Sequence, residues 1–155
     1  MRVILPGSYD PVTLGHLDII ERAAKKYDEV YVVAFVNPEK SYAFSPAERV
    51  KMLALATEHL KNVRVGYSDK RVVDYMRENK IDKIIKGYRN SIDLEYEKIQ
   101  AEYNLENGGY ETELIGASEG LIDVSSSLAR ARITEDGELT DILPPRVADF
   151  LKSKD

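Results

Sequence analysis

Val3-Ile4-Leu5-Pro6-Gly7-Ser8-Tyr9-Asp10-Pro11 stands near the start of the chain, an apolar run that ends in a cluster of residues that break regular structure. We interpret residues 3–5 as a buried strand and residues 6–11 as the loop that leaves it. From Gly15 to Tyr27, apolar residues recur at helical spacing with charged residues on the other faces, so we expect an amphipathic helix there. This order of strand, loop and helix opens an alternating α/β pattern.

The rest of the chain continues this alternation. Further strands are expected at 30–36, 63–67, 83–85 and 110–115, and further helices at 46–60, 71–79, 92–106, 125–133 and 147–152. Alternating strands and helices with short links imply parallel strands joined by right-handed crossovers. We therefore predict an α/β fold, a doubly wound five-stranded parallel sheet with C-terminal helices, in a single domain over residues 1–155.

Composition and charge exclude several classes of protein. The 155 residues include 22 Lys and Arg, 27 Asp and Glu and no Cys, with a formal net charge of −5. Without cysteine there is no disulfide, no thiol nucleophile and no Cys-ligated metal. The acidic balance argues against a general nucleic-acid binder, and no apolar run approaches the roughly 18 residues of a membrane-spanning helix. We expect a cytoplasmic protein with no nucleic-acid partner and no membrane partner.

Function should be sought at one edge of the predicted sheet. In a doubly wound sheet, ligands bind outside the carboxyl ends of the strands, where the strand order reverses. Four loops would meet there, at residues 6–16, 37–45, 86–91 and 116–127. The first loop lacks the glycine patterns of dinucleotide-binding and P-loop proteins. Gly15 and His16 nevertheless stand at a helix start, where N–H groups and the helix dipole favour phosphate. His16 could equally be a capping residue.

Two further clusters have the composition of anion-binding sites. Lys86, Gly87 and Arg89 follow the fourth predicted strand directly, so two cations and a close-approach glycine are expected at the ligand edge. Residues 125–127 are three serines that open a helix, where hydroxyl groups and free N–H groups suit a polyphosphate. The first cluster could also be a solvated basic turn, and one serine would be enough to cap the helix.

The segment Thr13-Leu14-Gly15-His16 resembles the Thr/His-x-Gly-His signature with which the nucleotidyltransferase superfamily grips the α-phosphate of a nucleoside triphosphate. With threonine in the first position, the segment resembles the pattern of the phosphopantetheine adenylyltransferase family. Many relatives in the superfamily, including cytidylyltransferases, have histidine at that position. Four more segments match that family in order and spacing: Phe44-Ser45-Pro46-Ala47-Glu48-Arg49, Lys86-Gly87-Tyr88-Arg89, Asp93-Leu94-Glu95-Tyr96-Glu97 and Val124-Ser125-Ser126-Ser127-Leu128. The resemblance covers nearly the whole chain.

The resemblance implies a Rossmann-like nucleotidyltransferase fold. It also implies a reaction in which the phosphate of 4′-phosphopantetheine attacks the α-phosphorus of ATP, giving dephospho-coenzyme A and pyrophosphate in the penultimate step of coenzyme A synthesis. Mg²⁺ would be carried on the triphosphate with no dedicated protein ligands, and the chain would form a homohexamer.

The resemblance also assigns residues to these roles. Catalysis would fall to His16, Ser8 and Lys40, with His16 donating to the α-phosphate. Phosphopantetheine would be bound by Ser8, Lys40, Val72 and Lys86. ATP would be bound by Ser8, Tyr9, His16, Gly87, Tyr88, Arg89, Glu97, Leu121, Ile122, Asp123, Val124, Ser125, Ser126 and Ser127.

Two positions depart from the family pattern, and two alternatives remain open. Lys86 stands where most members have Arg, which keeps the charge but loses the bidentate fork, and Ser8 stands where Thr is usual. Another small nucleotidyltransferase, such as a cytidylyltransferase that makes a CDP-alcohol, is the first alternative. The second is a non-catalytic receiver or nucleotide sensor with Asp10 and Asp69 as its phosphoacceptor pair. Residues 116–118 lack the lysine that a receiver has after its fifth strand.

Overall fold

The computed structural model describes residues 1–154, and within them strands and helices alternate. The strands are β1 (Arg2–Gly7), β2 (Glu29–Phe35), β3 (Val63–Ser68), β4 (Lys83–Tyr88) and β5 (Thr112–Gly116). The helices are α1 (Leu14–Lys26), α2 (Pro46–Thr57), α3 (Val72–Asn79), α4 (Ser91–Gly108), α5 (Ser126–Thr134) and α6 (Pro145–Lys152). Within these described residues, no helix combines the length and the apolar composition that crossing a bilayer requires.

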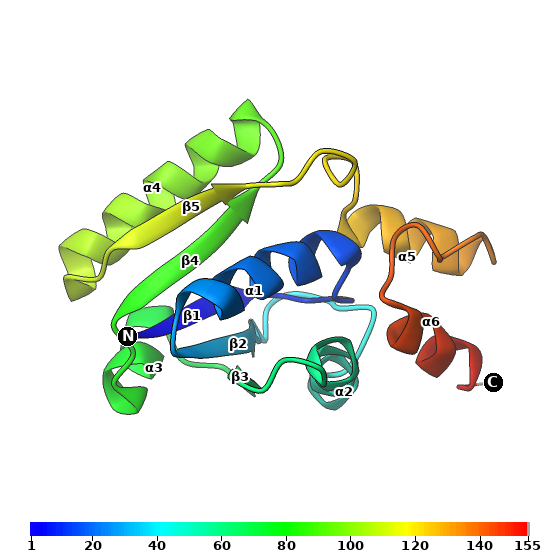
Figure 1. Cartoon of the computed structure of the whole chain (residues 1–155), viewed down its shortest axis with the longest axis horizontal. Helices are drawn as coiled ribbons and strands as arrows, with labels where there is room; N and C mark the ends of the chain where they lie inside the picture. The colour runs from blue at the N-terminus through cyan, green and yellow to red at the C-terminus, as the bar shows by residue number, and fades with distance from the viewer. Residues whose placement is uncertain (155) are drawn as a thin grey trace.

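The five strands form one sheet in which all neighbours are parallel, so the predicted α/β fold with a doubly wound sheet is confirmed. The strand order is β3-β2-β1-β4-β5. The chain builds one half of the sheet from β1 outward and then returns to add β4 and β5 on the other side of β1. Figure 1 shows α1 crossing in front of β1, whereas α4 lies beside β4 and β5. The strand order reverses between β1 and β4, so a ligand site is expected at their carboxyl ends.

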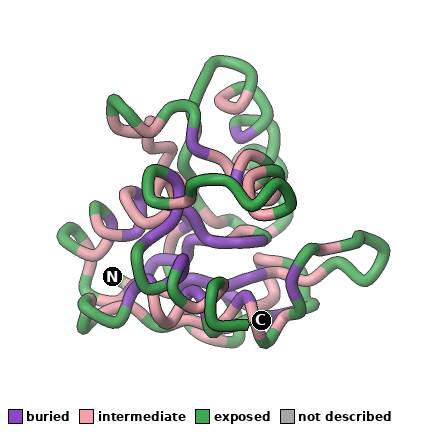
Figure 2. Tube along the Cα trace, turned by 90° about the vertical axis from the view of Figure 1, so that its right-hand side faces the viewer, coloured by how far each residue is buried: buried purple, intermediate pink, exposed green. Residues whose placement is uncertain are grey.

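The two faces of the sheet are covered by different helices. Along β1 and β2, Val3, Leu5 and Val32 alternate with Ile4 and Val33, as the two-residue period of a strand requires. The first three pack in a cluster with residues of α1, α2, α5 and α6, whereas the other two pack against α3. Figure 2 shows these buried segments running through the middle of the molecule beneath exposed helices and loops. The strands are therefore apolar on both faces, as a parallel sheet between helices demands.

The start of α2 follows from its sequence. The Ser45 hydroxyl accepts a hydrogen bond from the Glu48 N–H at 3.1 Å, and the Glu48 carboxylate accepts one from the Ser45 N–H at 3.0 Å. This reciprocal capping box, with Pro46 in the first helical position, satisfies amides that would otherwise lack partners. The predicted start is confirmed.

Strand β4 is longer than the sequence predicts. The expected strand ended at Ile85, but β4 continues through Lys86 and Gly87 to Tyr88, which pairs with Gly116 of β5. Lysine and glycine are weak strand formers, so sequence pattern alone places them in a loop. The hydrogen-bond ladder with β5 outweighs that preference. Lys86 and Gly87 therefore belong to the sheet itself, and their backbone is fixed by it.

Candidate active site

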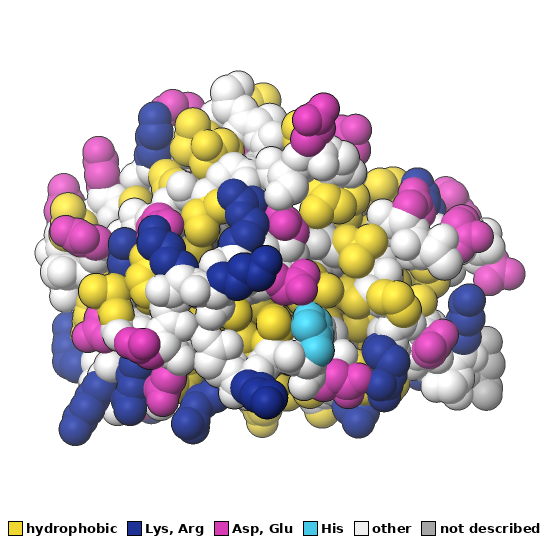
Figure 3. Space-filling model, in the orientation of Figure 1, with side chains coloured by type: hydrophobic (Ala, Val, Ile, Leu, Met, Phe, Trp, Pro, Cys, Tyr) yellow, Lys and Arg dark blue, Asp and Glu magenta, His cyan; other side chains and the backbone are white. Residues whose placement is uncertain are grey.

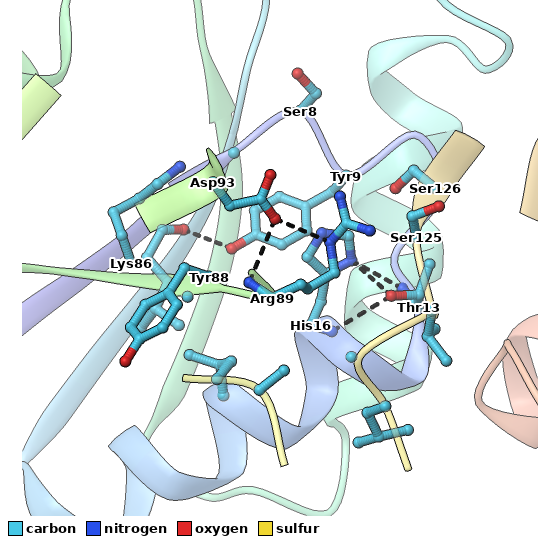
Figure 4. Close-up of a pocket in the computed structure, with 18 of the residues that line it drawn as sticks. Ser8, Tyr9, Thr13, His16, Lys86, Tyr88, Arg89, Asp93, Ser125 and Ser126 are labelled. Carbon is cyan, nitrogen blue, oxygen red and sulfur yellow. Dashed lines mark hydrogen bonds and ion pairs between the residues drawn. The ribbon is translucent and has the colours of Figure 1, made fainter. Parts of the chain in front are cut away.

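A cavity of about 350 Å³, here called the first cavity, opens at the carboxyl ends of β1 and β4. Its walls come from the loop after β1, the start of α1, the end of β4, the loop after β5 and the start of α5. Figure 4 shows side chains from these segments gathered around one space. Among the lining residues are Ser8, Tyr9, Thr13, Gly15, His16, Lys86, Gly87, Tyr88, Arg89, Asp93, Leu121, Val124, Ser125, Ser126 and Ser127.

A second cavity, of about 270 Å³, lies between the end of β1 and the side of α4. Its lining is partly apolar and partly polar, and it includes Phe35, Val72, Tyr96, Glu97, Gln100, Ala101 and Asn104. Pro6, Gly7, Ser8 and Lys86 line both cavities. The two cavities therefore adjoin at the end of β1, and molecules bound in them would meet beside Ser8 and Lys86.

The start of helix α1 is held by reciprocal hydrogen bonds between Thr13 and His16. The His16 N–H donates to the Thr13 hydroxyl at 3.3 Å, and the Thr13 N–H donates to the imidazole Nδ1 of His16 at 3.0 Å. Histidine thus takes the place of the usual Glu or Gln in a capping box. His16 therefore is a capping residue, and it caps the helix through Nδ1. Its other ring nitrogen, Nε2, takes no part in the cap and can bind a ligand.

The same bond fixes the tautomer of the imidazole. Because Nδ1 accepts from the Thr13 N–H, a neutral His16 carries its own hydrogen on Nε2. Burial, and after it the positive charges of Lys86 and Arg89, lower the pKa of His16 to about 4 from its ordinary value of 6.5. At neutral pH the ring is therefore uncharged and offers an Nε2–H donor.

Tyr9 supports this imidazole. Its ring packs edge-on against His16 with the centroids 4.9 Å apart, and its hydroxyl donates to the Leu5 carbonyl at 2.9 Å. The backbone of Tyr9 has a φ of 49°, in the left-handed region that costs a non-glycine residue of order 1 kcal/mol. These two contacts hold the residue in that conformation. The Tyr9 hydroxyl is therefore committed to the protein, although the residue lines the first cavity.

Gly15 supplies an uncommitted amide in the first turn of α1. The Leu14 N–H donates to the Ile142 carbonyl at 2.7 Å and the His16 N–H to Thr13, whereas the Gly15 N–H has no partner within residues 1–154. A Cβ on Gly15 would lie 3.5 Å from the nearest protein atoms, an ordinary contact, so protein packing does not require glycine here. A free N–H at the positive end of a helix, in the lining of the first cavity, suits an anionic oxygen.

The three serines at the start of α5 have different partners. The Ser125 hydroxyl caps the helix by accepting a backbone N–H one turn further on. The Ser126 hydroxyl donates to the Pro11 carbonyl at 2.8 Å and ties α5 to the loop after β1. The Ser127 hydroxyl accepts a hydrogen bond from the Arg130 guanidinium at 3.2 Å. Ser125 and Ser127 therefore keep their hydroxyl hydrogens for a ligand, whereas that of Ser126 is committed.

Cations at the two cavities each lie beside a carboxylate. The Nε of Arg89 is 3.3 Å from Oδ2 of Asp93 at the first cavity. The Nζ of Lys86 is 3.4 Å from Oε2 of Glu97, without hydrogen-bond geometry. Glu97 is only 8% exposed, so Lys86 is a nearby cation for a largely buried carboxyl group. Each of the two cations thus lies beside both a carboxyl group and a cavity.

Most of the residues that the resemblance implies come together, but four are placed elsewhere. Lys40 is exposed on the loop after β2, and Ile122 and Asp123 are exposed on the loop after β5. None of these three lines either of the two cavities. Glu97 lines the second cavity, not the first, whereas Val72 lies in the second cavity as the resemblance implies.

Sequence reasoning did not single out Arg130. It lies on α5 one turn after Ser127 and also donates to the Asp10 carbonyl at 2.9 Å, so it joins α5 to the loop after β1. The three-residue spacing from Ser127, which puts both side chains on one face of a helix, is the signal that could have found it. Asp93, which sequence reasoning named only as part of a matched segment, lines the first cavity.

Asp10 has a structural role that opposes the receiver alternative. Asp10 is 4% exposed, and its two carboxylate oxygens accept the N–H groups of Ala43 at 2.8 Å and Phe44 at 2.9 Å. These bonds tie the loop after β1 to the segment before α2. A receiver needs an accessible phosphoacceptor, so Asp10 does not fit that function.

The fold and the first cavity define a nucleotide-binding α/β domain suited to transfer chemistry on phosphate. A helix amide, a neutral imidazole donor, serine hydroxyls and cations all line one space. The chain belongs to the cytidylyltransferase-like family, because the model of that family matches residues 4–132. This match runs from β1 into α5 and includes every lining residue of the two cavities. The protein is therefore a nucleotidyltransferase.

Replacing Gly15 should separate folding from nucleotide binding. Gly15→Ala improves helix propensity, and the methyl group has room in the protein, so we expect an unchanged or slightly higher melting temperature. The methyl would crowd an anion at the Gly15 N–H, and ATP affinity should fall roughly tenfold or more, as for one lost charge-assisted hydrogen bond. Gly137→Ala is the matched control, since Gly137 has a similar 3.5 Å contact and lines neither cavity. Unchanged ATP affinity in Gly15→Ala, measured by calorimetry, would remove this amide from the site.

His16→Ala should lower kcat on the order of 10²–10³-fold while ATP binding changes little. The Nε2–H donor gains strength only as charge develops on the transferring phosphate, so its loss falls on turnover. Because the pKa of His16 is about 4, the kcat profile of the wild type should show no ionisation of this residue above about pH 5. His59→Ala, at an exposed histidine, controls for loss of an imidazole. A His16→Ala variant with wild-type kcat would exclude His16 from the reaction.

Proposed function

We propose that the protein transfers the adenylyl group of ATP to 4′-phosphopantetheine, giving dephospho-coenzyme A and pyrophosphate. The observation that carries the proposal is the pair of cavities that adjoin at Ser8 and Lys86. The first has the donors that a triphosphate requires. The second suits the pantetheine arm, whose methyl groups and two amides match its mixture of apolar side chains with Gln100 and Asn104. The sequence resemblance supplies the identity of both substrates.

The proposed chemistry needs positioning and charge stabilisation from the protein. A phosphate oxygen of the acceptor attacks the α-phosphorus in line, the bond to the β-phosphate breaks, and pyrophosphate leaves. Because the acceptor phosphate is itself the nucleophile, no covalent intermediate with the protein is needed. The Gly15 N–H and the His16 Nε2–H would bind the α-phosphate as its charge rises, and Ser127, Arg130 and Arg89 would bind the β- and γ-phosphates.

Ser8 and Lys86 would hold the acceptor phosphate where the cavities adjoin. The backbone of Lys86 is fixed in β4, and its side chain lies between both cavities and Glu97. Lys40 would add a second cation from the exposed loop after β2. Val72 would contact the pantetheine arm. In this arrangement the nucleophilic oxygen would lie beside the α-phosphorus.

Mg²⁺ would enter as part of the nucleotide substrate. Within residues 1–154, no three His, Cys, Asp or Glu side chains are grouped as a metal site. Among the described residues, Asp93 is the one carboxylate that lines the first cavity, and it lies beside Arg89. This donor set fits an ion bound mainly by phosphate oxygens and water, which is the usual coordination of Mg²⁺ on nucleotides. When bound, the ion would neutralise charge on the leaving pyrophosphate.

The outer face of α4 supports a homo-oligomer. Ile92, Tyr96, Ile99 and Tyr103 are exposed and recur at helical spacing, which forms an apolar stripe. Figure 3 shows apolar side chains at the surface among the charged ones in the region of α4. Exposed apolar patches of this kind mark interaction sites. We propose that further copies of the chain cover this face in a homohexamer, which sedimentation at several protein concentrations would measure; a monomer throughout would contradict it.

A panel of nucleotides and acceptors tests the proposed function. The chain is incubated with Mg²⁺, with ATP or CTP, and with 4′-phosphopantetheine or a small alcohol phosphate; pyrophosphate and product mass are measured. We expect pyrophosphate release from ATP with 4′-phosphopantetheine, and a product with the mass of dephospho-coenzyme A. His16→Ala gives the background rate. A CDP-alcohol as the main product would replace the proposal with a cytidylyltransferase.

Lys86 tests the position of the acceptor phosphate. Lys86→Ala should weaken 4′-phosphopantetheine binding roughly 10- to 100-fold, as for one charge-assisted hydrogen bond, with a smaller effect on ATP. Lys86→Arg should keep or improve binding, because the guanidinium can meet two phosphate oxygens. Lys98→Ala, at an exposed lysine of α4 that lines neither cavity, is the control. Calorimetric titration with 4′-phosphopantetheine measures this effect. If Lys86→Ala binds 4′-phosphopantetheine as tightly as the wild type, another cation must hold the acceptor phosphate.

A further inference from the structure

Arg49 is a fully buried cation beneath the active-site loop. It lies in the first turn of α2, is 0% exposed, and is the largest of the fully buried side chains. Its Nη1 donates to the carbonyl oxygen of Ser8 at 2.9 Å. Ser8 lines both cavities and is itself exposed. A buried charge is therefore attached directly to the backbone of the residue at which the two cavities adjoin.

The surroundings of Arg49 satisfy its guanidinium group only in part. Nε and Nη2 are buried and have no hydrogen-bond partner within residues 1–154. No carboxylate within those residues forms an ion pair with it. An unpaired buried cation costs several kcal/mol, and an apolar side chain of similar size is often as stable or more stable in such a place. Fold stability alone does not explain an arginine here.

Arg49 also contacts the loop after β2. Its guanidinium carbon lies 4.0 Å from the ring centroid of Tyr42, a stacking distance. The Tyr42 hydroxyl accepts the Asn37 N–H at 3.0 Å, and the Asn37 carbonyl accepts the Lys40 N–H at 3.0 Å. A continuous series of contacts therefore leads from Ser8 through Arg49 and Tyr42 to the turn that carries Lys40.

We propose that Arg49 is a positioning residue that sets Ser8 and the loop 37–45 relative to each other. This inference rests on the proposed function, in which Ser8 and Lys40 hold the acceptor phosphate from two different loops. The Asp10 carboxylate already ties the far end of that loop to the loop after β1 through Ala43 and Phe44. Arg49 adds a second attachment between the loop 37–45 and the loop after β1. Two attachments fix the orientation of one loop relative to the other, whereas a single attachment would allow rotation.

The contacts of Arg49 separate it from the nucleotide end of the site. It has no hydrogen bond to the α1 terminus or to the α5 serines within the described residues. Loss of the guanidinium should therefore leave ATP affinity close to that of the wild type. It should act on the acceptor, because a displacement of about 1 Å in a reacting group can cost on the order of 100-fold in rate.

Arg49→Met is the main variant, and Lys51→Met, which removes an exposed charge from the same helix, is its control. We measure melting temperature, amide hydrogen exchange, ATP affinity by calorimetry, and kcat and KM for 4′-phosphopantetheine. Arg49→Met should keep or raise the melting temperature while exchange in residues 7–10 and 37–44 accelerates on the order of tenfold. The kcat/KM for the acceptor should fall roughly 10- to 100-fold. Arg49→Lys, which keeps a donor, should recover part of the loss.

Tyr42→Leu keeps the proposal testable if Arg49→Met does not fold. It removes the stacked ring but leaves the Ser8 bond, so it should loosen residues 37–44 and raise the acceptor KM without changing residues 7–10. If Arg49→Met folds, unchanged amide hydrogen exchange and unchanged kcat/KM for the acceptor would overturn the proposal. If only Tyr42→Leu folds, the same two results in that variant would overturn it. An equal loss of protection from hydrogen exchange across the whole chain would also overturn it. If the wild type does not use 4′-phosphopantetheine, the proposed function is wrong. Hydrogen exchange and ATP affinity in the variants would still test whether Arg49 positions the two loops.

Discussion

The hydrogen bond from the Thr13 N–H to Nδ1 of His16 is the interaction on which the site depends. It starts helix α1, fixes the ring, and leaves the hydrogen on Nε2. The pKa of about 4 keeps this arrangement intact at neutral pH, because a protonated Nδ1 could no longer accept from Thr13. Burial lowers this pKa most, and the cations that lower it further, Lys86 and Arg89, themselves line the first cavity. A group placed for structural reasons at a helix start thereby becomes a donor for chemistry on phosphate.

The surrounding residues are held by contacts among the loops at the switch point. Asp10 binds the segment before α2, Ser126 and Arg130 bind the loop after β1 from α5, and Arg49 binds it from α2. Each bond uses a backbone group of one loop and a side chain of another element. Nucleotidyl transfer depends mainly on positioning of the reacting groups, and these contacts fix the loops that line the first cavity.

Sequence reasoning predicts the fold well because its signals are local. The apolar runs of β1 and β2 and the Ser45 capping box determine their elements without help from distant residues. The end of β4 could not be predicted in this way, because pairing with β5 decides it. Gly15 and His16, which a short motif places at a helix start, line the first cavity. The contacts of Arg130 with the loop after β1 and the place of Glu97 in the second cavity could not be predicted, because they depend on how helices pack on the sheet.

Nitrogen NMR of the imidazole of His16 would show where its hydrogen lies and at what pH the ring is protonated. The two ring nitrogens have different shifts in each tautomer and in the cation, so one pH series reports both the position of the hydrogen and the pKa. We expect a neutral ring with the hydrogen on Nε2 from neutral pH down to about pH 5, and protonation centred near the pKa of about 4. Hydrogen on Nδ1, or protonation near the ordinary pKa of 6.5, would contradict it.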